Sequence, residues 1–128
     1  MPNILGALIP WVGLALLGLI FMANAVGVVD QSIAVNELAA TGMPRRAAKR
    51  MVAAGRLVQL VATPCLFIHS TRLVAALLLT LFLIGATLTA HAFWRRSFTP
   101  ADRNRHLANF LKNVAIMGGL LLAATWRT

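Results

Sequence analysis

Apolar residues dominate four stretches of this chain, and polar or basic residues are concentrated between them. The apolar stretches cover about residues 4–29, 51–68, 73–94 and 107–126. A helix of about 20 apolar residues crosses the hydrocarbon core of a bilayer, and these stretches are close to that length. The pattern predicts an all-α integral membrane protein, a four-helix bundle with short loops in one domain covering residues 1–128.

The connections indicate which of the predicted helices are neighbours. The stretch 69–72 is so short that the second and third spans must be antiparallel neighbours. The longest connection, residues 30–50, contains a short interfacial helix predicted at about 34–40. It then has a stop at Thr41-Gly42-Met43-Pro44, because Gly permits a left-handed turn and Pro starts a helix at its first position.

Charge orients the predicted helices. Only 12% of the residues are charged, against about 25% in a soluble domain, yet the formal net charge is +9. The positive-inside rule predicts cytoplasmic long loops and outside termini, because ten cations flank those loops and two lie opposite. The ten are Arg45, Arg46, Lys49, Arg50, Arg56, Arg95, Arg96, Arg103, Arg105 and Lys112, and the two are Arg72 and Arg127. Nucleic-acid binding is disfavoured, since no base-stacking aromatic pattern accompanies the charge.

In this orientation all four spans carry polar side chains to the same depth, at the cytoplasmic edge of the bilayer. Asn109, Lys112 and Asn113 share one face of the fourth span, because their offsets are 0, +3 and +4. The complete set is Asn24, Gln59, His91, Asn109, Lys112 and Asn113. Polar groups in lipid need partners, so the sequence predicts a hydrogen-bonded cluster between the helices.

Two interpretations of this cluster are open. In the structural one, the side chains pair only with one another and hold the helices in register. In the other, the donors bind the headgroup of a quinone or a lipid beneath an apolar groove, and the pattern suits either ligand. The residues that would bind it are His91, Lys112, Asn113, Asn109 and Gln59.

Other chemistries are disfavoured. No span contains Asp or Glu well inside it, and a cation–drug antiporter of four-helix design needs such a carboxylate. A bis-histidine haem needs two His at matched depth, but His69 is across the membrane and His106 is in or at the end of a loop. No Cys/His/carboxylate cluster indicates a metal, and the single Cys65 excludes an intrachain disulfide. We therefore expect no catalytic residues.

Small residues in the fourth span predict a packing site. Ala115, Gly119 and Ala123 are spaced by four, and Gly118 adjoins the middle one. Such a row lets another helix approach closely.

Three segments resemble the DoxX family of small four-helix membrane proteins, and their order covers about residues 4–125. They are Thr41-Gly42-Met43-Pro44, Thr71-Arg72-Leu73, and His91-Ala92-Phe93-Trp94 followed by Phe110-Leu111-Lys112-Asn113-Val114-Ala115-Ile116-Met117-Gly118-Gly119-Leu120-Leu121. The resemblance implies a four-helix bundle and a link to membrane redox chemistry. We expect the protein in a bacterial cytoplasmic membrane. Some relatives are subunits of a thiosulfate:quinone oxidoreductase.

Two departures from that family pattern bear on function. The family often shows Gly-x-x-Lys where this chain has Asn24-Ala25-Val26-Gly27, and a Glu where Gln59 stands. The groups best suited to move protons are thus absent, which favours a structural or lipid-binding subunit over an enzyme.

We therefore expect a small non-catalytic membrane subunit that packs against a larger membrane or redox complex, or against copies of itself. It would contact membrane lipids and bind a lipid or quinone at the polar cluster. The first alternative is a component of a quinone-coupled membrane oxidoreductase. The second is a transporter of small solutes.

Overall fold

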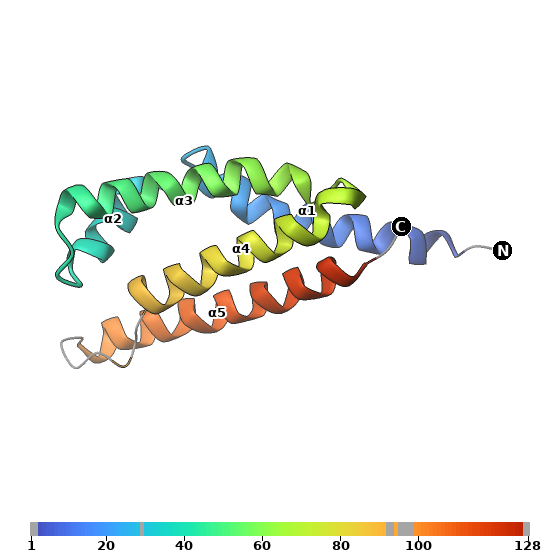
Figure 1. Cartoon of the computed structure of the whole chain (residues 1–128). Helices are drawn as coiled ribbons and strands as arrows, with labels where there is room; N and C mark the ends of the chain where they lie inside the picture. The colour runs from blue at the N-terminus through green and yellow to red at the C-terminus, as the bar shows by residue number, and fades with distance from the viewer. Residues whose placement is uncertain (1–2, 29, 92–93, 95–98, 127–128) are drawn as a thin grey trace.

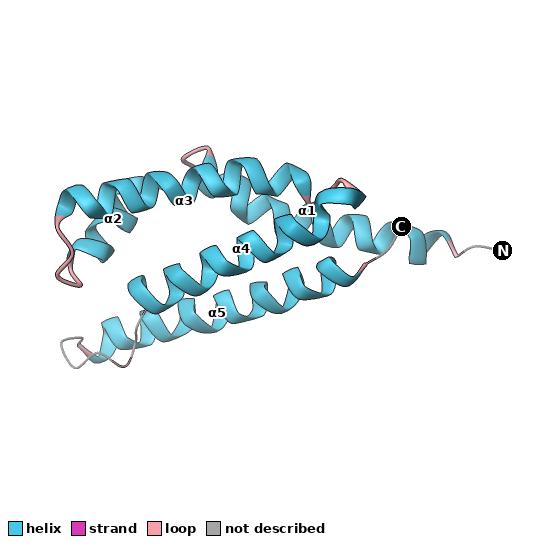
Figure 2. Cartoon of the chain, viewed as in Figure 1, coloured by secondary structure: helices cyan, strands magenta, loops and turns pink. Residues whose placement is uncertain are grey.

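The computed structural model describes residues 3–28, 30–91, 94 and 99–126. Within these ranges the chain forms five helices and no strand, which confirms the all-α class (Figures 1 and 2). The helices are α1 (Ile4–Ala25), α2 (Gln31–Ala39), α3 (Arg45–Cys65), α4 (His69–Ala90) and α5 (Pro100–Thr125). Predictions that concern Ala92, Phe93, Arg95, Arg96 and Arg127 lie outside the described residues.

Three of these helices, α1, α4 and α5, are long and apolar enough to cross a membrane. The second predicted span, at 51–68, is not confirmed as a fourth. Its helix α3 begins at Arg45, six residues before the predicted start at 51, and its first half carries most of its cations. The helix continues through this basic segment because Ala47 and Ala48 are strong helix formers and no Gly or Pro interrupts it.

Helices α4 and α5 also start earlier than the predicted spans. The predicted connection 69–72 is the first turn of α4, so the turn between α3 and α4 is even shorter than expected. Helix α5 starts at Pro100, and the hydroxyl of Thr99 accepts a hydrogen bond from the amide of Asp102 at 3.2 Å. A Thr N-cap followed by Pro at N1 stabilises a helix start even where the first turns are polar.

The short helix predicted at about 34–40 is present as α2. The carboxylate of Asp30 caps it by accepting a hydrogen bond from the Ser32 amide at 2.9 Å, and this bond lowers the pKa of Asp30. After α2 the backbone of Gly42 adopts φ +97°, the left-handed turn expected there. Val35 and Leu38 of α2 pack on Ala48 of α3.

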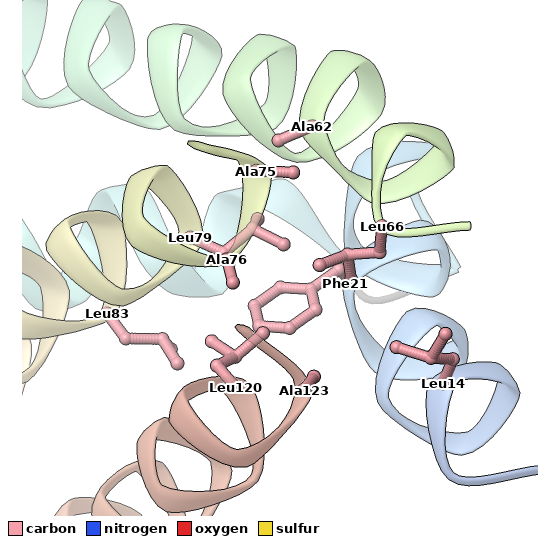
Figure 3. Close-up of a cluster of buried hydrophobic side chains, with 10 residues drawn as sticks. All are labelled: Leu14, Phe21, Ala62, Leu66, Ala75, Ala76, Leu79, Leu83, Leu120 and Ala123. Atoms are coloured by element: carbon pink, nitrogen blue, oxygen red, sulfur yellow. The ribbon is translucent and has the colours of Figure 1, made fainter. Parts of the chain in front are cut away.

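The long helices lie side by side, with α4 and α5 antiparallel neighbours (Figure 1). Helix α1 contacts α3 and α5, whereas α2 contacts α3 and α4. All four long helices contribute to one apolar core, in which the Phe21 ring lies close to Leu120 (Figure 3). The core consists of Leu14, Phe21, Ala62, Leu66, Ala75, Ala76, Leu79, Leu83, Leu120 and Ala123.

A glycine sets the distance between α3 and α4. A Cβ on Gly55 would lie 2.5 Å from Cε2 of Phe82, which is closer than real Cβ contacts. The absence of a side chain at Gly55 therefore lets the Phe82 ring pack against the α3 backbone. This close approach holds α4 beside the half of α3 that carries Gln59.

Candidate functional site: two polar ends of the helices

The polar side chains predicted to form one cluster are divided between two helix pairs. On the α1–α3 side, Nδ2 of Asn24 donates a hydrogen bond to Oε1 of Gln59 at 3.3 Å. The amide nitrogen of Gln59 donates to the Gly55 carbonyl of its own helix at 3.1 Å. Gln59 is only 2% exposed, so both ends of its amide are hydrogen-bonded inside the protein.

The second pairing joins α4 and α5. Nδ2 of Asn113 donates to Oγ1 of Thr87 at 3.1 Å, and both side chains are buried. The backbones of α3 and α5 do not lie next to each other along their described residues, so Gln59 and Asn113 belong to different helix pairs. Each amide links two neighbouring helices.

A pair of histidines lies one helical turn further along α4. Nδ1 of His91 and Nδ1 of His106 are 3.2 Å apart, so one ring donates a hydrogen bond to the other. His106 was expected in or at the end of a loop, but it lies inside α5 and is 3% exposed. The guanidinium of Arg105 is 3.5 Å from Nε2 of His106 and forms a 2.8 Å ion pair with Glu37. The cluster of Glu37, His91, Arg105 and His106 thus connects α2, α4 and α5.

The environment of His91 disfavours its charged form. Burial lowers the pKa of His91 from its usual value of 6.5, and the electrostatic effects of His106, Lys112 and Arg105 act in the same direction. The negative charge of Glu37 opposes them. The neutral form is also the one in which the two facing Nδ1 atoms share a single hydrogen bond without repulsion.

Asn109 and Lys112 differ from the paired residues. Neither side chain makes a hydrogen bond to another described residue. Lys112 is exposed and Asn109 is half-buried, and Lys112 lies near enough to His91 to influence its pKa. Of the five predicted headgroup ligands, His91, Lys112, Asn109 and Asn113 therefore lie on the α4–α5 side, and Gln59 lies on the α1–α3 side.

The small residues of α5 face two directions. A Cβ on Gly119 would lie 3.2 Å from Leu17 of α1, and Ala123 is buried in the core. Ala115 and Gly118 are exposed, and a Cβ on Gly118 would have no described side chain within 4 Å. Gly119 and Ala123 of the predicted packing row therefore pack inside the chain, whereas Ala115 and Gly118 remain exposed on its surface.

The opposite end of the helices carries a site that the sequence interpretation overlooked. Arg72, in the first turn of α4, is 2% exposed, and its Nε donates to the Leu66 carbonyl at 2.7 Å. Its Nη1 donates to the Trp126 carbonyl at 3.3 Å. Its guanidinium carbon is 4.3 Å from the centre of the Trp126 ring and 5.6 Å from that of Trp11. These three side chains form what we call the arginine–tryptophan clamp.

Helix ends explain why an arginine is stable in this position. Leu66 and Trp126 are the C-cap residues of α3 and α5, where carbonyls lack helical partners and the helix dipole is negative. The two Trp rings meet edge to face, with centroids 4.9 Å apart, and Nη2 of Arg72 is buried without a hydrogen bond to any described residue. The sequence did contain a signal for this site. Arg72 is a single cation shortly after the predicted second span, Trp11 lies near the start of α1, and Trp126 lies at the end of α5.

Metal chemistry finds no support in the described ranges, which contain no group of three His, Cys, Asp or Glu residues able to hold an ion. The histidine cluster brings only two imidazoles together, and Glu37 is paired with Arg105.

The fold and these sites define a small all-helical protein with three membrane-length apolar helices and polar pairs that join its helices. The chain belongs to the HR-like lesion-inducing family, whose model matches residues 22–124. No curated protein and no solved structure is significantly similar to it.

The family match corrects the resemblance to the DoxX family, which was wrong. The segments that carried that resemblance have local physical explanations. Gly42 makes a left-handed turn, and Arg72 binds two helix ends. Asn113 pairs with a neighbouring helix, and Gly119 admits Leu17. Such residues serve any close-packed helical bundle, so they do not identify one family.

Proposed function

We propose that this protein is a small non-catalytic subunit that crosses a bacterial cytoplasmic membrane with its four long helices and packs against a larger membrane complex. In this proposal α3 is the fourth crossing, with its basic half at the cytoplasmic surface together with α2. The long loops are cytoplasmic and the termini lie on the other side. The family description names a lesion-inducing effect and no reaction, so it is compatible with a role through association.

The observation that carries the proposal is the pairing of polar side chains between helices. Asn24 with Gln59, Asn113 with Thr87, and His91 with His106 each satisfy one another across two helices. A catalytic centre needs donors or bases that remain available to a substrate. These groups are instead used to hold helices in register, as in a structural subunit.

The open part of the small-residue row supports association with a partner. Gly118 and Ala115 leave the α5 backbone accessible on the outer surface, where a second helix can approach closely. This surface is the position at which we place the larger complex.

The test uses two glycines in matched surroundings. Gly118 of α5 and Gly85 of α4 are both exposed, and a Cβ on either one would have no described side chain within 4 Å. We expect the wild type, extracted in mild detergent, to carry a stoichiometric membrane partner that Gly118→Leu loses and Gly85→Leu keeps. Purification of the wild type as a stable monomer, or equal retention by both variants, would refute the proposal.

A second candidate function rests on the donors left open beside His91. Lys112 and Asn109 make no hydrogen bond with described residues, and two such donors suit the carbonyl oxygens of a quinone. This function predicts quinone in the purified protein and its loss in Lys112→Met. Arg103→Met, an exposed cation of the same helix, is the control. Equal quinone content in all three proteins would exclude it.

A further inference from the structure

An open groove of about 270 Å³ lies where the end of α1 meets the middle of α3. Its walls are apolar except for the side chains of Gln31 and Arg56, which lie beside one another. The groove is lined by Ala25, Gln31, Ala53, Arg56, Leu57 and Leu60. It therefore combines an apolar trough with one positive charge.

The backbone at the end of α1 holds the Arg56 guanidinium in place. Nε and Nη2 donate to the Ala25 carbonyl at 3.2 and 3.0 Å, and Nη1 donates to Oε1 of Gln31 at 2.6 Å. Gly27 has φ +83°, and a Cβ there would lie 3.0 Å from Nη2 of Arg56. The chain therefore turns at Gly27 in a way that leaves room for the guanidinium.

Arg56 retains binding capacity after these contacts. A guanidinium has five N–H donors. Each of the three nitrogens uses one of them on a described residue, so within the described part of the chain one N–H remains on each terminal nitrogen. Among the described residues its charge forms no ion pair, since the ion pairs there involve Arg105. Two free N–H groups on one guanidinium match the spacing of two oxygens of a phosphate.

We propose that this groove binds an anionic phospholipid, with its phosphate on Arg56 and an acyl chain along Leu57 and Leu60. The apolar α1 ends at Ala25, beside Arg56, so the guanidinium lies at the depth where lipid headgroups meet the hydrocarbon. The apolar walls favour a lipid over a soluble phosphate. The other cations of α3 attract negatively charged headgroups to the same surface.

This site rests on the proposed membrane insertion but is independent of the proposed partner. It lies on the α1–α3 side, whereas the open glycine Gly118 and the donors Lys112 and Asn109 lie on α5. A protein that binds lipid here and has no partner would refute only the proposed function, and the reverse result would refute only this site.

The experiment measures lipid binding to the detergent-purified full chain by native mass spectrometry. The probes are dioleoyl phosphatidylglycerol and dioleoyl phosphatidylcholine, with inorganic phosphate as a competitor. Arg56→Lys keeps the charge but loses the paired N–H groups, so we expect about tenfold weaker binding of phosphatidylglycerol. Ala53→Leu fills the groove while leaving Arg56 intact, and we expect a similar loss.

Two control variants separate this site from general attraction to a basic surface. Arg46→Lys alters an exposed cation of α3, and Ala54→Leu adds the same bulk one position beyond the groove-lining Ala53. Both should bind phosphatidylglycerol as the wild type does. Undiminished binding in Arg56→Lys and Ala53→Leu would overturn the proposal. Equal losses in the controls, or displacement of the lipid by inorganic phosphate, would also overturn it.

Discussion

Arg72 and Arg56 each donate to carbonyls at the ends of helices, but their surroundings differ. Arg72 is buried between two Trp rings and binds the last carbonyls of α3 and α5. Arg56 is half-exposed beside a groove and binds the last residue of α1. Both use the negative end of a helix dipole in place of a carboxylate.

The same contrast extends to the two ends of the helices. At the clamp, one side chain serves three helices, because Arg72 of α4 holds α3 and α5. At the other end the helices are joined by separate groups, such as the pair of Asn113 with Thr87 and the histidine cluster. Loss of one group should therefore cost more at the clamp than at any single pair.

The largest expected effect is that of Arg72→Met. The variant keeps much of the apolar volume but loses two charge-assisted hydrogen bonds to helix-end carbonyls and the stacking on Trp126. We expect the free energy of unfolding to fall by about 3 kcal/mol. Equilibrium unfolding in detergent, monitored by circular dichroism, measures this change.

Arg46→Met is the control for the removal of a positive charge. Arg46 is exposed near the start of α3, so its loss should change stability by no more than about 0.5 kcal/mol. If Arg72→Met were as stable as this control, the hydrogen bonds of the clamp would do no more than offset the cost of burying its charge.

The helices could be predicted from the sequence because long apolar runs leave few alternatives in a chain of this composition. Their starts were predicted less well where a helix begins in polar sequence. Thr99 and Pro100 are a start signal that hydrophobicity alone does not register, and α3 extends through its cations because alanines separate them.

The candidate site was predicted only in part. Periodicity predicted polar residues at one end of the helices, but it did not predict which of them form pairs. It could not indicate that Gln59 faces Asn24 while Asn113 faces Thr87, because that depends on which helices are neighbours. Arg72 was overlooked because its partners are carbonyls and rings, which carry no charge pattern in the sequence.

A smaller effect is expected for the pair formed by Asn113 and Thr87. In a double-mutant cycle with Asn113→Ala and Thr87→Val, we expect a coupling energy of about 0.6 kcal/mol, typical of hydrogen bonds between membrane helices. Unfolding of the wild type, the two single variants and the double variant provides the value. A coupling of zero would mean that the 3.1 Å contact contributes nothing to stability, and a value as large as the Arg72 effect would remove the contrast between the two ends.

The smallest effect, and the one specific to the histidine cluster, is a dependence of stability on pH. The folded-state pKa of His91 is lowered from 6.5, so between that lowered value and 6.5 the unfolded chain binds more protons than the folded one. Stability is therefore complete above pH 6.5 and is lost as the pH falls through this window. We expect His91→Gln to remove part of the loss of stability between about pH 7.5 and pH 5.5. The control variant His69→Gln, at the clamp end of α4, should lose as much stability over this range as the wild type. An unchanged slope in His91→Gln would mean that Glu37 compensates for the burial of His91 and for the electrostatic effects of His106, Lys112 and Arg105 on its pKa.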